Sequence, residues 1–526
     1  MTTRRDFLRT AAAATAVAGL GSCAPGTLIP PPTPGDASIN DLALEGLNAA
    51  RAAGASYADA RIARYRAQAV ATRERQVTNV SDQESFGVGV RALVDGSWGF
   101  AGTRDMSRNG VQQAAREAVR LARAARTVQR RPVEMSPVAA VRGSWRTPVT
   151  RDPIDVPIEE KVALLLAANE AALKVPRIRF VNSSMQLLRE EKTLATTDGS
   201  LTTQTFVRVG PNFSATAFAD GDVQSYSVEL APRGSGWEYI ESLNLPGNAE
   251  RWASLAAEKL SARTVTPGKH DLILDPTNLW LTIHESIGHP TELDRAMGLE
   301  ANYAGTSFVA PPEDYIGKFK YGPDFMNVQA DRTQEGSLSR VAWDDEGVPA
   351  DKWWIIEKGI FKDYQTTRDQ AALIAPLTGV RRSHGTSFAD SWATVQFQRM
   401  PNISLMPGER NIGLDEIVAD TANGIIVKNR GSWSIDHQRY NFQFSGQAYY
   451  EVKNGKITGM LKDVAYQANT PEFWNSMDMI GGERSYWLGG SFGDGKGEPS
   501  QSNSVSHGAV PARFRQVTIV STARTS

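Results

Sequence analysis

Cysteine, histidine and long apolar runs are scarce in this chain of 526 residues. Its only cysteine is Cys23, so no disulfide can form within the chain and no other position can offer a thiolate to a metal. The 57 basic and 58 acidic residues leave a net charge of −1, which argues against a general nucleic-acid binder because such proteins cluster positive charge. Beyond the N-terminal segment, no apolar run approaches the length of a membrane span.

The N-terminus has the pattern of an export signal. Two arginines at positions 4–5 precede a short alanine-rich stretch that ends at Cys23, and the whole resembles a twin-arginine signal with a lipobox. We predict that residues 1–23 are the signal, that Cys23 carries a lipid, and that the proline-rich segment 24–38 is a tether. The predicted location is therefore extracytoplasmic, on the periplasmic side, with the lipid anchor as the only membrane contact. The alternative is an N-terminal apolar helix with an incidental cysteine.

The rest of the chain predicts an α+β protein in three parts. Residues 39–131 have the pattern helix, strands, helix and predict a small N-terminal α+β domain. After a linker that bears prolines and arginines, residues 152–265 predict a middle domain in which helices accompany an antiparallel sheet. Residues 266–526 predict a large β-rich C-terminal domain, with hairpin turns at 358–359 and 453–456.

The most informative motif lies at residues 284–289 and reads His-Glu-Ser-Ile-Gly-His. Two neutral imidazoles can bind zinc, and a glutamate beside the first can take a proton from a water on the metal, as in His-Glu-x-x-His metallopeptidases. The spacing here is one residue longer, and positions five apart on a regular helix point about 140° away from each other. We therefore expect the helix to bulge or end before the second histidine, where Gly288 and Pro290 favour an irregular backbone. The alternative is a chance string of ordinary surface or core histidines.

The motif and the C-terminal tail together resemble the TldD/PmbA family of zinc metallopeptidases, on its TldD-like side. The resemblance rests on residues 284–294, 406–428, 441–449, 451–459 and 493–499. It implies a small N-terminal α+β domain, a middle domain and a β-rich C-terminal domain that holds the metal. It also implies hydrolysis of peptides, since TldD-type proteins, paired with a PmbA-type partner, are linked to degrading unfolded peptides and maturing peptide antibiotics.

The resemblance also assigns roles to individual residues. His284 and His289 would be zinc ligands, and Glu285 would be the general base. The family's expected third ligand is a cysteine in a Cys-Gly-Lys setting, which reads Asp-Gly-Lys at 494–496, so Asp494 occupies the matching position. Aspartate oxygen is an accepted zinc ligand, although it leaves a harder site for which other divalent metals compete better. The alternative for Asp494 is an aspartate that caps its own glycine turn.

Other polar residues of this region are candidates for supporting roles. His507 is the rival third ligand, and either Glu292 or Asp294 could orient an imidazole. The remaining histidines are predicted to be structural or at the surface, although one of them could line a polar cleft with two arginines: these residues are His270, His384 and His437, with Arg381 and Arg382 beside His384. The tail at 489–508 is rich in glycine, serine and asparagine, which fits either a flexible loop or a tight site-forming one.

We therefore predict a metallopeptidase with one Zn²⁺ that hydrolyses unfolded or modified peptides, with Glu285 activating the water on the metal. The peptide is expected to bind as an extended strand along a sheet edge. A PmbA-like partner or a second copy of the chain is the expected assembly. Two alternatives stay open: a non-catalytic partner subunit of such a complex, and a metal-dependent amidase or esterase.

Overall fold

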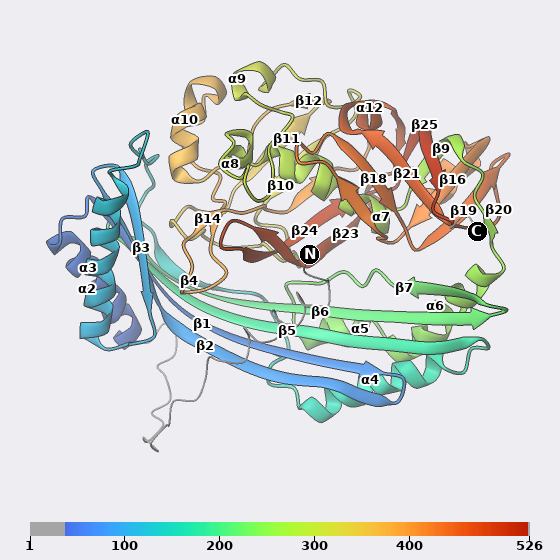
Figure 1. Cartoon of the computed structure of the whole chain (residues 1–526), viewed down its shortest axis with the longest axis horizontal. Coiled ribbons are helices and arrows are strands. Elements are labelled where there is room, and N and C mark those ends of the chain that lie inside the picture. The colour runs from blue at the N-terminus through green and yellow to red at the C-terminus, as the bar shows by residue number, and fades with distance from the viewer. Residues whose placement is uncertain (1–36, 524–526) are drawn as a thin grey trace, which may run out of the picture. The chain divides into compact units, whose positions relative to one another are not determined.

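A computed structural model describes residues 37–523, and the structure has the α+β class predicted from the sequence (Figure 1). The predicted signal, the lipid site Cys23 and nearly all of the tether lie outside the described residues. Within residues 37–523, no helix is both long enough and apolar enough to cross a membrane.

The N-terminal half of the described chain is built on one long sheet with the strand order β3-β2-β1-β5-β6-β4, to which β7 is added beside β6. Its strands are β1 (Tyr57–Arg73), β2 (Gln76–Val94), β3 (Ser97–Thr103), β4 (Arg142–Arg146), β5 (Ile178–Thr196), β6 (Leu201–Ala219) and β7 (Asp222–Ser227). The helices of this half are α2 (Ala37–Ala52), α3 (Arg108–Ala125), α4 (Ile158–Ala172), α5 (Trp237–Ser242) and α6 (Leu245–Leu260). Tight turns join its hairpins, and Gly199 takes a φ of +101° in the turn between β5 and β6, a conformation that glycine adopts without steric cost.

The two faces of β5 have different environments because neighbouring side chains on a strand alternate. Met185 and Leu187 are buried in the apolar core that α4 and α6 form against the sheet. Lys192 points to the opposite face, where its Nζ lies 3.0 Å from a carboxylate oxygen of Asp345 in the C-terminal part of the chain. The C-terminal part therefore lies over the face of the sheet that carries polar side chains, as Figure 1 also shows.

The C-terminal part contains a ten-stranded mixed sheet with the order β17-β18-β21-β25-β9-β16-β19-β20-β8, with β22 paired to β25. The strands of this sheet are β8 (Arg263–Thr264), β9 (Gly268–Leu274), β16 (Asn423–Lys428), β17 (Trp433–Ile435), β18 (Asn441–Ser445), β19 (Ala448–Lys453), β20 (Lys456–Lys462), β21 (Val464–Asn469), β22 (Met477–Ile480) and β25 (Ala512–Ser521). Smaller sheets are formed by β10 (Val328–Asp331), β11 (Lys352–Glu357), β12 (Ile360–Phe361) and β15 (Ile403–Leu405), by β13 (Ser387–Phe388) with β14 (Phe397–Gln398), and by β23 (Trp487–Lys496) with β24 (Gln501–Ala509). The α-helices are α7 (Pro276–Ile283), α8 (Leu293–Ala296), α9 (Pro312–Tyr315), α10 (Arg368–Thr378), α11 (Leu414–Ala419) and α12 (Thr470–Asn475).

The structure differs from the sequence-based expectation at two places in the N-terminal half. The segment assigned to a linker contains β4, which pairs in parallel with β6. Strand β1, expected in the first domain, pairs along its length with β5, expected in the middle domain, so the two regions share one sheet. The predicted hairpins at 358–359 and 453–456 are confirmed as the β11-β12 and β19-β20 turns.

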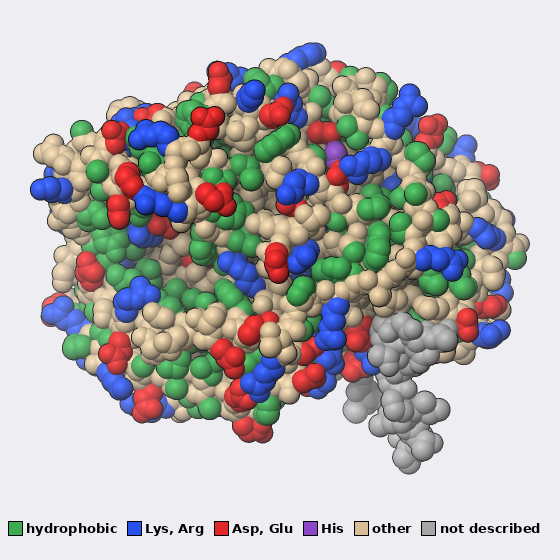
Figure 2. All heavy atoms as spheres, turned by 180° about the vertical axis from the view of Figure 1, so that it is seen from behind, with side chains coloured by type: hydrophobic (Ala, Val, Ile, Leu, Met, Phe, Trp, Pro, Cys, Tyr) green, Lys and Arg blue, Asp and Glu red, His purple; other side chains and the backbone are tan. Residues whose placement is uncertain are grey.

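The surface carries charges of both signs. Figure 2 shows Lys and Arg side chains interspersed with Asp and Glu over one face. This mixture agrees with the nearly balanced composition of the chain.

Candidate metal centre

The histidine motif follows directly on helix α7, whose start is fixed by its sequence. The Asp275 side chain accepts a hydrogen bond of 3.0 Å from the backbone N–H of Thr277, and Pro276 occupies the first helical position, where no N–H is needed. The helix is buried over its length and places the motif inside the C-terminal part.

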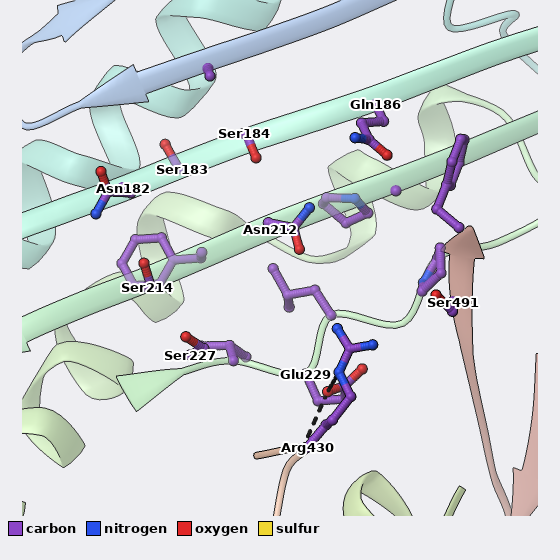
Figure 3. Close-up of a pocket in the computed structure, with 18 of the residues that line it drawn as sticks. Asn182, Ser183, Ser184, Gln186, Asn212, Ser214, Ser227, Glu229, Arg430 and Ser491 are labelled. Carbon is purple, nitrogen blue, oxygen red and sulfur yellow. Dashed lines mark hydrogen bonds and ion pairs between the residues drawn. The ribbon is translucent and has the colours of Figure 1, made fainter. Parts of the chain in front are cut away.

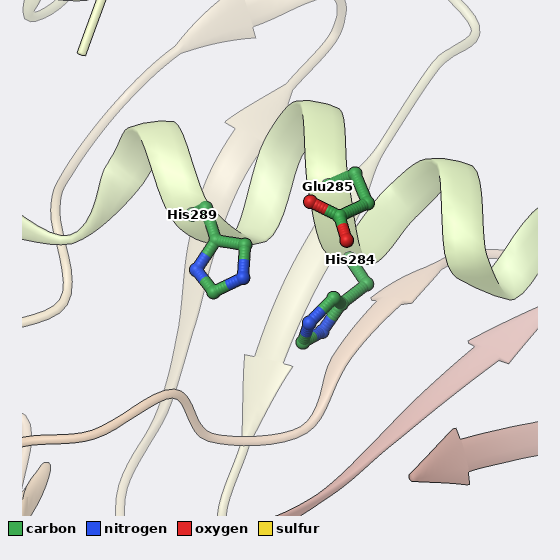
Figure 4. Close-up of side chains that lie close together, drawn as sticks. All are labelled: His284, Glu285 and His289. Carbon is green, nitrogen blue, oxygen red and sulfur yellow. The ribbon is translucent and has the colours of Figure 1, made fainter. Parts of the chain in front are cut away.

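The expected helix distortion is confirmed. Residues 284–288 form one π-helical turn, in which the backbone N–H of His289 donates to the carbonyl of His284 five residues earlier. This hydrogen bond places the two histidines on one face of the helix (Figure 4), where their rings meet edge to face with centroids 4.5 Å apart. Pro290 ends the π turn, and the side chain of Gln365 donates a 2.6 Å hydrogen bond to the carbonyl of Gly288, which stabilises the irregular backbone.

The tail is site-forming rather than a loose loop, because β23 and β24 form a hairpin that brings Asp494 to both rings. Asp494 Oδ1 lies 3.5 Å from Nε2 of His284 and 3.6 Å from Nε2 of His289. Donor atoms that share one tetrahedral zinc are about 3.4 Å apart, since each lies about 2.0–2.2 Å from the metal. The distance from this oxygen to each imidazole nitrogen is therefore that of two donors on one zinc.

Glu285 is the competing carboxylate, since ligand atoms of His284, Glu285 and His289 lie within 4.8 Å of one another. However, Oε2 of Glu285 is paired with the guanidinium of Arg439. Asp494 Oδ1 instead faces both imidazoles, while its Oδ2 lies 3.3 Å from Arg399. Two carboxylates therefore lie near the histidines, and the assignment of Asp494 as the third ligand stays a prediction.

Burial and neighbouring charges set the protonation of the three candidate ligands. Burial, together with Arg439, lowers the pKa of His289 well below its usual value, which favours the neutral imidazole that metals bind. Burial alone would raise the pKa of Asp494, but His289 and His284 hold this pKa well below its usual range. Burial alone would lower the pKa of His284, but Asp494 raises it.

Residues around the candidate ligands orient them. His289 Nδ1 lies 3.0 Å from Oε2 of Glu292, as expected for a group that directs an imidazole. Asp294, expected in the same role, instead pairs with Lys496, whose Nζ lies 2.8 Å from its carboxylate and 3.3 Å from Oε1 of Glu292. Burial alone would raise the pKa of Glu292, but Lys496 and Arg295 hold it well below its usual value.

The other histidines occupy three kinds of position. His507, the rival third ligand, contacts His284 from behind, with its Nε2 2.8 Å from Nδ1 of His284. His384 is buried between Asp351 and Asp363 and lies outside the metal centre. The ring of His270 bonds to the carbonyl of Thr266 near the surface, and His437 is exposed.

The sequence analysis missed three cations that contact the candidate centre. Lys496 belongs to the tail segment that carries the family resemblance, but its partner was not predictable because Glu292 lies about 200 positions away. Arg399 and Arg439 are isolated arginines in strand-rich segments and carry no motif that would distinguish them from surface arginines.

The candidate centre opens into a cleft of about 470 Å³, here called the metal cleft. The cleft is lined by the two histidines, Glu285 and Asp494, and the edge strand β17 contributes Trp433, Ser434 and Ile435. A cation at this place would therefore be reachable by a ligand from solvent.

Comparison with known proteins agrees with this architecture. Residues 58–122, 151–265 and 267–521 match the descriptions PmbA/TldA metallopeptidase domain 1, central domain and C-terminal domain, respectively. The C-terminal match is to a family described as metallopeptidases, and it contains the buried group His284, Glu285 and His289. The chain belongs to the PmbA/TldD family.

Individual relatives are distant, and the matched length differs between them. A metalloprotease of Methanocaldococcus jannaschii is 26% identical over 446 residues, covering 84% of this chain and 93% of the relative. A zinc metalloprotease TldD homolog of Saccharolobus solfataricus is 26% identical over 264 residues, covering 50% of this chain and 54% of that protein.

Solved structures show the same fold. A Thermotoga maritima protein named for modulation of a DNA gyrase superposes with a TM-score of 0.71 at 17% identity, covering 92% of this chain and 100% of that one. TldE from Thermococcus kodakarensis gives a TM-score of 0.66 at 16% identity, covering 92% of this chain and 100% of that one.

Proposed function

We propose that this protein is a zinc-dependent metallopeptidase that hydrolyses unfolded or modified peptides, with His284, His289 and Asp494 as metal ligands. The observation that carries the proposal is the pair of distances, 3.5 Å and 3.6 Å, from one Asp494 oxygen to the two imidazole nitrogens. When bound, a divalent cation would polarise the scissile carbonyl and lower the pKa of a coordinated water toward neutrality. The metalloprotease names of the relatives support the same reaction class.

The chain's own residues supply the proton transfers. Glu285 is placed beside the candidate ligands, and we assign to it the removal of a proton from the attacking water and its delivery to the leaving amine. Arg439 holds Glu285 and lines the metal cleft, so it is placed to stabilise negative charge that develops on the carbonyl oxygen. The unpaired edge of β17 beside these residues is suited to an extended peptide, which would add to the sheet through its backbone.

The test compares Glu285→Gln and His284→Ala with the wild type for metal content after dialysis and for cleavage of unstructured peptides. We expect Glu285→Gln to retain the metal and lose activity by about 10²–10⁴-fold, whereas His284→Ala should lose both. His270→Ala is the matched control, because that ring lies near the surface and bonds only to Thr266. Full activity of Glu285→Gln would remove this residue from the mechanism.

The second candidate is a non-catalytic partner subunit, which the similarity to the TldE fold favours. It predicts that the metal-loaded protein cleaves no peptide by itself but binds a TldD-like chain, and that the complex loses no activity when Glu285 of this chain is replaced by Gln. A metal-dependent amidase or esterase would instead prefer simple amides or esters over peptides in the same assays.

We also propose that the protein is exported and lipid-anchored at Cys23, on the basis of the N-terminal sequence pattern. Radiolabelled palmitate should enter the wild type in its native host but not Cys23→Ala. Equal labelling of the two proteins would contradict the anchor.

A further inference from the structure

A second cleft, here called the polar pocket, lies beside the metal cleft. It has a volume of about 580 Å³ and is bounded by β5 and β6 on one side and by residues 490–493 of β23 on the other (Figure 3). Arg430, Ser491 and Gly493 line both clefts. A chain bound at the candidate metal centre can therefore extend into the polar pocket.

The sheet side of the polar pocket presents amides and hydroxyls. These are the side chains that alternate away from the helix-covered face of the sheet: Asn182, Ser184 and Gln186 on β5, with Asn212 and Ser214 on β6 (Figure 3). Asn182, Ser184, Gln186 and Asn212 make no side-chain hydrogen bond to any other group among residues 37–523. Their donors and acceptors are therefore available to a ligand, and peptide backbone groups match them.

The side chain of Arg430 lies at the junction of the two clefts. Its nearest carboxylate oxygen belongs to Glu229 and lies 3.9 Å from Nε, beyond hydrogen-bonding distance. The guanidinium carbon lies 5.3 Å from the ring centroid of Trp280, which stacks on His507 behind the candidate ligands. Across the described part of the chain, no protein acceptor is hydrogen-bonded to this guanidinium, and Figure 3 shows it pointing into the pocket.

We propose that the polar pocket binds the segment of a peptide substrate that carries a carboxylate, and that Arg430 pairs with this group. The planar guanidinium offers two parallel N–H donors that fit a carboxylate, while the amides of the sheet hold the adjoining backbone. The carboxylate is either the C-terminus of the peptide or an acidic side chain. This inference rests on the proposed peptidase function, and it implies cleavage at a fixed short distance from the acidic group.

Glu229 is the group that could reverse this assignment, because a carboxylate could instead receive a substrate amine. Its side chain is only 9% exposed, whereas that of Arg430 is 35% exposed, so an entering group meets the arginine first. The backbone N–H of Arg430 donates to Glu229 at 3.4 Å, which keeps one Glu229 oxygen turned toward the protein. Burial raises the pKa of Glu229 to about 7 although Arg430 opposes the shift, so this carboxyl repels an entering anion less than an ordinary glutamate would.

The experiment measures binding without turnover, using the metal-loaded full chain with Glu285→Gln. Fluorescent unstructured peptides are compared in matched pairs by anisotropy: a free C-terminus against a C-terminal amide, and an internal aspartate against asparagine. Adding Arg430→Gln should lower the affinity for the carboxylate peptide of one pair by about tenfold or more. The affinity for the neutral peptide of that pair should not change. The pair that responds identifies the source of the carboxylate.

Two further variants complete the test. Glu229→Gln should bind the carboxylate peptide at least as tightly as its parent, because a repelling group is removed. Arg410→Gln, at an exposed arginine outside both clefts, should change nothing. Equal weakening of charged and neutral peptides by Arg430→Gln would overturn the proposal. So would a loss of binding in Glu229→Gln that affects a peptide with a free N-terminus but not its acetylated counterpart. These binding results can be distinguished from a failure of the proposed function. If the protein is not a peptidase, the wild type with Glu285 intact will cleave no peptide.

Discussion

His284 and His507 are joined through their rings, with Nδ1 of His284 2.8 Å from Nε2 of His507. Nδ1 of His507 lies 2.9 Å from the carbonyl oxygen of Ile403, which only accepts, so this nitrogen carries the proton. Nε2 of neutral His507 is then an acceptor, and Nδ1 of His284 must donate to it. The chain of hydrogen bonds leaves the lone pair of His284 on Nε2, the atom that faces Asp494.

The first prediction follows from this chain of hydrogen bonds. His507→Ala removes the acceptor that fixes the tautomer of His284, so zinc affinity should fall by about 10–100-fold, measured by competition with a chelator. His507→Gln should recover most of this loss, because its amide can donate to Ile403 and accept from His284. Asp494→Ala, which removes a proposed ligand, should lose more affinity than His507→Ala. If the two alanine variants lose equal affinity and glutamine gives no rescue, His507 is itself a ligand.

A second prediction concerns Lys496, which is fully buried between Glu292 and Asp294. Lys496→Met removes the buried cation that pairs with Asp294 and leaves Arg295 as the cation of Glu292, so the free energy of unfolding should fall by about 3–5 kcal/mol. Since Glu292 also orients His289, zinc affinity should fall together with the stability. Thermal unfolding and chelator competition measure the two effects.

Two further variants separate the charge effect from simple misfolding. Glu292→Gln combined with Lys496→Met removes one charge of each sign and should recover part of the stability. Lys462→Met, at a lysine that pairs with Asp222 near the surface, should cost less than about 1 kcal/mol. A double variant no more stable than Lys496→Met would show that charge balance is not the cause.

Structural features that depend on the spacing of nearby residues could be predicted from the sequence. The helix-to-π transition at 284–288 was predictable because five-residue spacing, Gly288 and Pro290 all act within one turn. The sharing of one sheet by β1 and β5 was not, because strand pairing over 100 or so positions leaves no periodic trace in either strand. Strand β4 was missed for a related reason, since four of its five residues are exposed and lack the alternation of a half-buried strand.

The same distinction holds within the candidate centre. Both histidines and Glu285 lie in one short motif, and the family resemblance supplied Asp494 through its neighbouring Gly-Lys. Arg399 and Arg439 act through contacts between distant segments, so only the folded chain reveals them.

The last prediction concerns a buried histidine away from the metal centre. His384 Nδ1 lies 2.7 Å from Asp351 and its Nε2 lies 3.0 Å from Asp363, while Trp353 stacks on the ring at 4.1 Å. Arg382 is the other charged side chain at this cluster and lies 2.7 Å from Asp351. Both ring nitrogens face carboxylates, an arrangement that only the doubly protonated imidazolium satisfies.

This arrangement makes part of the folding stability dependent on pH. Burial alone would lower the pKa of His384, but the hydrogen bonds to Asp351 and Asp363 outweigh it and raise the pKa above the usual 6.5. Because the folded state binds this proton more tightly, the stabilisation is complete below pH of about 6.5 and is lost as the pH rises through the folded pKa. Thermal unfolding of wild type and His384→Gln should therefore differ most near pH 6 and converge toward pH 9. Arg382→Gln, at a half-exposed arginine, should show a small difference that does not vary in this way. A His384→Gln deficit that is the same at both pH values would mean that the ring acts through packing on Trp353 and not through its charge.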